Sequence, residues 1–106
     1  MTDEQKDTTI GRLVRERKEA EERLAYLETE TRRIGIQLAN LGASLQGSPA
    51  TVVFENKTVD MKYSGRGPVY NANDLNAEKV IGLTSDIRTT LDTIESLRRD
   101  LTKFGL

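Results

Sequence analysis

The chain has 106 residues, of which 36% are hydrophobic, 31% charged and 5% aromatic. It contains no cysteine and no histidine, which excludes disulfide bonds, thiolate or imidazole metal ligands, and the commonest general base. The 16 basic and 17 acidic residues nearly cancel, which disfavours a polyanion as the main partner. We therefore predict a mainly α-helical, single elongated domain over residues 1–106, with no catalytic residue, cofactor or metal.

A heptad repeat runs through the first half of the chain. At alternating intervals of three and four, every residue is apolar except Arg17 and Thr31. This spacing predicts a helix over about residues 4–46 that buries one narrow seam against another helix, as in a coiled coil. The seam positions are Ile10, Leu13, Arg17, Ala20, Leu24, Leu27, Thr31, Ile34, Leu38, Leu41 and Leu45.

Both ends of this helix have local signals. Thr2 and Gln5 have the spacing of a capping box, although the helix could instead begin near Thr8 or Thr9. Gly47 lies where a left-handed C-terminal cap is expected, and Pro49 cannot continue the helix.

Two features inside the helix have alternative explanations. Arg17 in the seam can fix the register of an oligomer, or its aliphatic stem can simply lie along the seam with the charge in water. The small residues Gly35, Ala39, Gly42 and Ala43 form a stripe that predicts close approach of another backbone, with a hinge as the alternative.

Residues 50–63 change to a period of two. They predict an antiparallel β-hairpin around an Asn56-Lys57 turn, in which Phe54 faces Val59. One face of this hairpin is apolar and consists of Ala50, Val52, Phe54, Val59, Met61 and Tyr63. Residues 64–73 are rich in glycine and asparagine and predict a loop.

A second helix is predicted over about residues 74–104. Asn73 or Asn76 can cap its start, Leu91 widens its apolar stripe, and Gly105 ends it. Its seam positions are Val80, Leu83, Ile87, Thr90, Ile94, Leu97, Leu101 and Phe104.

The two helices can fold back on each other as an antiparallel hairpin. Aligned from the connector, Leu24 meets Leu101, and the longer first helix leaves Ile10, Leu13 and Val14 beyond the second. These uncovered side chains predict a homo-oligomer, most simply a dimer that forms a helical bundle. The predicted interface residues are Ile10, Leu13, Val14, Arg17, Gly35, Ala39 and Gly42.

The connector offers a second candidate surface. Tyr63, Arg66, Val69 and Tyr70 have the composition of a protein-binding hot spot, unless the tyrosines pack on the hairpin. The sequence thus predicts a non-enzymatic protein–protein interaction module, such as an adaptor, inhibitor or assembly factor.

The order of elements and the distribution of charge suggest two alternative functions. The order long helix, β-hairpin, long helix resembles the layout of prefoldin subunits, which implies a chaperone that holds unfolded chains. A nucleic-acid-associated regulatory dimer is disfavoured because basic pairs such as Arg98-Arg99 alternate with acids. No apolar run is long enough to cross a membrane and the first residues are polar, so we expect a cytoplasmic location.

Overall fold

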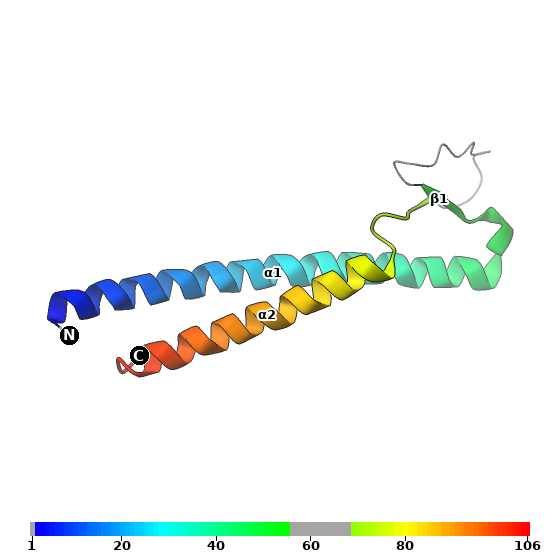
Figure 1. The fold of residues 1–106 in the computed structure, drawn as a ribbon. Helices are drawn as coiled ribbons and strands as arrows, with labels where there is room; N and C mark the ends of the chain where they lie inside the picture. The colour runs from blue at the N-terminus through cyan, green and yellow to red at the C-terminus, as the bar shows by residue number, and fades with distance from the viewer. Residues whose placement is uncertain (1, 56–68) are drawn as a thin grey trace. The chain divides into compact units, whose positions relative to one another are not determined.

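The computed structural model describes residues 2–55 and 69–106 (Figure 1). The described residues are mainly helical, and the two predicted helices are confirmed with ends that move by a few residues. The elements in chain order are α1 (Asp3–Gly47), the 3-10 helix η1 (Pro49–Thr51), β1 (Val53–Glu55), β2 (Val69–Asn71) and α2 (Ala77–Thr102).

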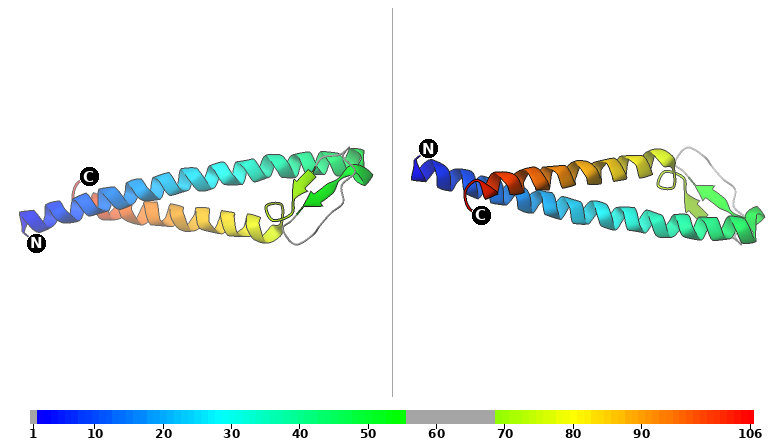
Figure 2. Two further views of the ribbon diagram at one scale, coloured as in Figure 1. Left: turned by 90° about the horizontal axis from the view of Figure 1, so that it is seen from above. Right: turned by 90° about the horizontal axis from the view of Figure 1, so that it is seen from below.

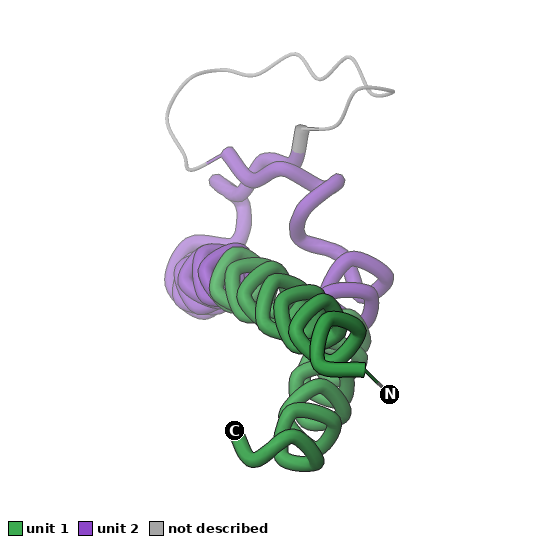
Figure 3. Tube along the Cα trace, turned by 90° about the vertical axis from the view of Figure 1, so that its left-hand side faces the viewer, with its two compact units in different colours: residues 1–28, 84–106 green, residues 29–83 purple. Residues whose placement is uncertain are grey.

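The chain divides into two compact units, which Figure 3 shows in different colours. Unit 1 consists of residues 1–28 and 84–106, and unit 2 consists of residues 29–83. Each unit therefore contains a part of both long helices. The single elongated domain and the homo-oligomer remain predictions.

In unit 1, the first part of α1 and the last part of α2 lie side by side and antiparallel (Figure 2). Leu13 forms a buried cluster with Leu97 and Leu101. Further along α1, Arg23 Nη2 lies 3.9 Å from Asp86 Oδ2. Along these contacts the residue numbers of α2 decrease as those of α1 increase. The two helix segments of unit 1 are therefore antiparallel, as predicted.

The predicted register of the two helices is wrong. Leu101 packs with Leu13 and not with Leu24, a shift of about three helical turns towards the N-terminus of α1. Leu13 is therefore covered by the second helix, and Ile10 packs against the same cluster. The prediction set the start of the second helix level with the end of the first, whereas residues 70–74 first return along α1 from Ser44 to Arg33.

Of the two caps predicted for α1, the structure has the N-terminal one only. The Thr2 amide donates to Gln5 Oε1 at 3.0 Å, and the Gln5 amide donates to Thr2 Oγ1 at 3.2 Å, which confirms the capping box. Gly47 has no left-handed conformation, so the predicted glycine cap is wrong. The helix stops there because Pro49 begins η1.

Unit 2 contains the last part of α1, the two strands and the first turns of α2. Its sheet is parallel and pairs Val53 with Val69, Phe54 with Tyr70, and Glu55 with Asn71. The rings of Phe54 and Tyr70 lie 6.1 Å apart between centroids. Parallel neighbours need a connection of a dozen or more residues, which the chain between the two strands provides.

This sheet corrects the hairpin prediction. The sheet of the described residues is parallel and not antiparallel, and it uses residues 69–71, which the sequence assigned to a loop. Ala50 begins no strand because it belongs to η1. The Asn56-Lys57 turn and the predicted second strand lie outside the described residues. The parallel pairing also departs from the hairpin that supported the resemblance to prefoldin subunits.

Both ends of α2 have clear caps. Asn76 Oδ1 accepts from the Lys79 amide at 2.9 Å, so Asn76 is the N-cap that the sequence offered with Asn73. At the other end Gly105 has a φ of 83°, and the Leu106 amide donates to the Leu101 carbonyl at 3.2 Å. These features form a Schellman motif, which explains why the helix ends before Gly105.

The heptad seam explains most of the burial. Every predicted seam residue of α2 is buried or half-buried, whereas Leu91 beside it is exposed. In α1 the seam is covered as far as Ile34, the most deeply buried side chain, and Leu41 is half-buried. Leu38 and Leu45 are the two seam residues left exposed.

Candidate interaction surface

The predicted interface residues of unit 1 have different environments. Leu13 is only 5% exposed and Ile10 is half-buried, so the helix pair itself covers both. Val14 remains 50% exposed. Arg17 is half-buried and its Nε lies 3.0 Å from Glu21 Oε1, so the charge is paired at the surface while the stem borders the seam. Val14 is thus the predicted residue in this unit with the most free apolar surface.

In the small-residue stripe of unit 2, Gly35 is exposed and Gly42 is half-buried. A Cβ atom placed on Gly35 or on Gly42 would meet nothing within 4 Å beyond its own helix among the described residues. Ala39 between them is exposed. No backbone in residues 2–55 or 69–106 approaches these glycines, so the described part of the chain does not explain them.

Two large side chains lie beside this stripe. Leu38 is 39% exposed and Leu45 is 48% exposed. At 3.6 residues per turn, the leucines and the small residues fall within about one third of the circumference of α1. We name this surface the open face, and it consists of Gly35, Leu38, Ala39, Gly42 and Leu45.

The open face lies in an uncharged stretch of sequence. No lysine, arginine, aspartate or glutamate occurs from Ile34 to Phe54, although charged residues make up 31% of the chain. Glutamates and arginines cover the exposed side of α1 in unit 1, where i,i+4 pairs such as Arg12 with Glu16 form. A solvated helix face usually carries such charges, so their absence marks the open face as different.

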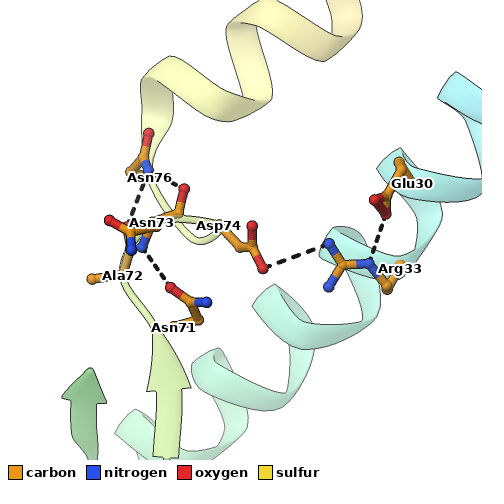
Figure 4. Close-up of polar contacts among 7 residues, drawn as sticks. All are labelled: Glu30, Arg33, Asn71, Ala72, Asn73, Asp74 and Asn76. Carbon is orange, nitrogen blue, oxygen red and sulfur yellow. Dashed lines mark hydrogen bonds and ion pairs between the residues drawn. The ribbon is translucent and has the colours of Figure 1, made fainter. Parts of the chain in front are cut away.

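Two contacts between α1 and later residues of unit 2 lie on the flank of α1 opposite the open face. The hydroxyl groups of Ser44 and Tyr70 share a hydrogen bond at 2.9 Å, and Tyr70 is 8% exposed. Arg33 Nη2 lies 3.5 Å from Asp74 Oδ2 in the turn before α2 (Figure 4). On a helical projection Arg33 points away from Gly42, so these contacts leave the open face free.

Arg33 is the centre of a small ionic cluster. Its Nε donates to Glu30 Oε2 at 2.7 Å, one turn away on α1. The hydrogen bond from Arg33 is the main reason that the pKa of Glu30 lies below the ordinary value of a glutamate; desolvation opposes it, and the positive charge of Arg33 adds to it. The same bond, with Asp74 nearby, raises the pKa of Arg33. The cluster fastens α1 to the turn that starts α2.

Three asparagines build that turn. The Asn73 amide donates to Asn71 Oδ1 at 2.9 Å, and Asn76 Nδ2 donates to the Ala72 and Asn73 carbonyls at 3.0 and 2.8 Å (Figure 4). Asparagine suits this role because its short amide replaces backbone partners in a tight turn. The turn therefore places Asp74 beside Arg33, and this structural role accounts for the three asparagines.

The predicted partner-binding residues separate in the structure. Tyr63 and Arg66 lie outside the described residues. Val69 is exposed on β2. Tyr70 is buried, with its hydroxyl at Ser44 of α1 and its ring beside Phe54 of β1, and not on the face of an antiparallel hairpin. Tyr70 is thus a structural contact and offers little surface to a partner.

Leu38 and Leu45 were not predicted as surface residues, because their spacing places them in the seam. The uncharged run from Ile34 to Phe54 was the signal that distinguishes this part of α1. Within residues 2–55 and 69–106, nine large hydrophobic side chains are exposed while seven hydrophobic residues are buried. This part of the chain therefore exposes more large hydrophobic side chains than it buries.

Other kinds of site find no support in the described part of the chain. It contains no group of three acidic side chains that could hold a metal ion. None of its helices is both long and apolar enough to span a membrane. A scan of protein-family models gives no match for this chain, and neither the curated proteins nor the solved structures contain a match to it.

Proposed function

We propose that this chain is a non-enzymatic protein–protein interaction module that uses the open face of α1 as its main docking surface. One observation carries the proposal: Leu38 and Leu45 are exposed beside Gly35 and Gly42 in a stretch without charge. The module acts as an adaptor, inhibitor or assembly factor in the cytoplasm. It functions as a homo-oligomer of this chain.

Physical reasons favour docking over solvation for this surface. Burying a leucine side chain that is now in water contributes roughly 1.5–3 kcal/mol, less what is already covered in the monomer. Glycines within α1 cost about 1 kcal/mol each relative to alanine, and nothing in the described chain uses the space they leave. A partner that fills this space would offset their cost.

The chemistry of the open face also restricts the partner. A neutral, apolar helix face has no cation to offer a phosphate, so a nucleic acid gains nothing from it. An apolar helix or strand of a protein gains both area and close backbone approach. We therefore take the partner to be protein.

The test compares the wild-type chain with a Leu38→Glu plus Leu45→Glu variant and with an Asn40→Glu control. Asn40 is exposed on the same helix but lies off the open face. Each protein is measured by light scattering from about 1 to 100 µM, a range that covers micromolar dissociation constants, and is used as bait in a cell lysate. We expect the wild type and the control to self-associate or to capture a defined protein, and the double variant to do neither.

Circular dichroism establishes that all three proteins keep their helices. A wild-type chain that stays monomeric over the whole range and captures no protein contradicts the proposed function. Suppression of the aggregation of unrelated denatured proteins by small amounts of the chain would instead support the chaperone alternative.

A further inference from the structure

We infer that a second copy of this chain covers the open face, with the two α1 helices antiparallel, so that Leu38 of each copy lies level with Gly42 of the other and Leu45 lies level with Gly35. The inference rests on the proposed function in one respect, namely that the open face is an interface. Beyond that function, we infer that the partner is a second copy, that the two α1 helices are antiparallel, and which residues of the two copies lie level with each other.

The spacing of the four residues makes the face complementary to itself. The two leucines are seven residues apart, and so are the two glycines. When the second α1 helix is reversed about position 40, its residue 42 lies level with residue 38 of the first helix, and its residue 35 lies level with residue 45. Each large exposed side chain then lies level with a position that has no side chain, and nothing in the described chain already fills that space. Ridges fit into grooves in this way when helices pack closely.

A parallel pairing in register has no such fit. It sets leucine level with leucine and glycine level with glycine. The large side chains then meet each other, and the glycine positions leave a gap between the helices. Packing of that kind leaves voids, and the lining of a void loses its contacts. The sequence of the open face therefore selects the antiparallel direction.

Charge supports a second copy as the occupant. In a contact with two-fold symmetry the same patch occurs on both sides, so a charged residue near its centre would face its own like charge. The open face carries no charged residue, whereas charged residues make up 31% of the chain. Self-pairing through it is therefore free of repulsion, unlike pairing through the charged faces of unit 1.

The ends of the paired segments are also compatible. The last turn of α1 contains no basic residue, so its C-terminal carbonyl groups lack a cation from their own helix. Antiparallel alignment about position 40 sets Arg32 of one copy level with Ser48, just beyond the end of α1 in the other. A cation at this position is favourable for the helix dipole.

Cross-linking tests the pairs directly because the chain has no cysteine of its own. Leu38→Cys and Gly42→Cys chains carry different affinity tags and are mixed at a concentration where sedimentation shows association, then oxidised. We expect the mixed disulfide to form at least tenfold faster than the disulfide of an Asn40→Cys control. The pair Leu45→Cys with Gly35→Cys should behave in the same way.

Several outcomes overturn the inference. A Leu38→Cys chain that cross-links with itself faster than the mixture shows a parallel pair. Association without preferential cross-linking at these positions shows that the copies meet elsewhere, which leaves the proposed function standing. A monomer that captures a different protein through the open face also overturns the inference alone. A monomer that captures nothing overturns both proposals.

A pair of glycine substitutions gives an independent measurement. Gly42→Leu fills the space that Leu38 of the second copy needs, and we expect it to weaken the dimer at least tenfold. Gly11→Leu is the control, since Gly11 is an exposed glycine of α1 in unit 1 with nothing within 4 Å of its Cβ position. Both substitutions favour the helix, so a loss confined to Gly42→Leu reports the interface. Equal dissociation constants for the two variants contradict the inferred pairs.

Discussion

Arg33 fastens unit 2 by contacting two carboxylates that lie far apart in the sequence. Glu30 is one turn away, whereas Asp74 belongs to the turn before α2. Periodicity predicts the first contact, because residues three apart on a helix are neighbours. It cannot predict the second, which depends on the path of the strands. Arg33 follows Arg32 in the sequence as a basic pair that could suggest phosphate binding, and the structure gives Arg33 a carboxylate partner within the chain.

The Glu30 carboxylate should make stability depend on acid pH. Its pKa is lowered in the folded chain, mainly by the hydrogen bond from Arg33, so its contribution to stability is present at neutral pH and is lost as pH falls through and below the ordinary glutamate pKa of about 4.3. We expect a Glu30→Gln variant to lose less stability than the wild type on this fall in pH. Urea unfolding followed by circular dichroism at pH 7, 5 and 3 measures the difference.

A Glu19→Gln variant controls for the removal of one exposed carboxylate from the same helix. Equal pH dependence in the wild type and in Glu30→Gln would show that the contact with Arg33 contributes nothing.

Two glycines of the C-terminal region should respond to alanine in opposite ways. Gly82 lies inside α2 with open space around it, so Gly82→Ala should raise the free energy of unfolding by about 1 kcal/mol. Gly105 has a φ of 83°, so Gly105→Ala should lower the free energy of unfolding by roughly 1–2 kcal/mol. Urea denaturation of both variants measures the two changes, and a gain at Gly105 would contradict the Schellman cap.

At the level of the elements, β1 and β2 show what alternation in a sequence can and cannot predict. The period of two identified residues 53–55 as a strand but gave no information on its partner. Asn56-Lys57 suggested a local turn, whereas the strand pairs with residues 69–71 in parallel. Tyr70 joins this pair to α1, so its burial links the sheet to the helix.

The hydrogen bond between Tyr70 and Ser44 should stabilise unit 2 measurably. Tyr70→Phe removes the hydroxyl that lies 2.9 Å from Ser44 Oγ, and we expect a loss of about 1 kcal/mol in the free energy of unfolding. Tyr26→Phe is the matched control, because Tyr26 is 63% exposed and its loss should fall within about 0.5 kcal/mol. Thermal and urea denaturation compare the variants, and similar losses would rule out a role for this bond.

The register of α1 against α2 in unit 1 is tested by two neighbouring residues. Leu13 is 5% exposed in contact with Leu97 and Leu101, so Leu13→Ala should cost about 2–5 kcal/mol. Val14 is 50% exposed, and Val14→Ala should cost less than about 1 kcal/mol. The register expected from the sequence left both residues uncovered, so equal, small losses would favour it over the structure.

For the whole molecule, the sequence predicted the two helices, most seam positions and three of the four helix ends correctly. Those features depend on neighbours within a few residues, where spacing and capping chemistry determine the outcome. The helix register and the strand pairing depend on how the connector returns, which no local pattern contains. Of the predicted surface residues, Gly35 and Ala39 are exposed and Gly42 is half-buried, whereas Leu13 and Tyr70 are buried in the chain itself.

The charge-free stretch of α1 has a consequence for how the molecule responds to ionic strength. Dissolved salt shortens the Debye length from about 10 Å at 0.1 M to about 3 Å at 1 M, which weakens exposed ion pairs and leaves apolar contacts intact. Surface pairs such as Arg98 with Glu95 should weaken on this account, while assembly through the open face should persist or tighten in sodium sulfate. Sedimentation in 0.1 M and 1 M salt would therefore separate an assembly held by shape and water exclusion from one held by opposite charges.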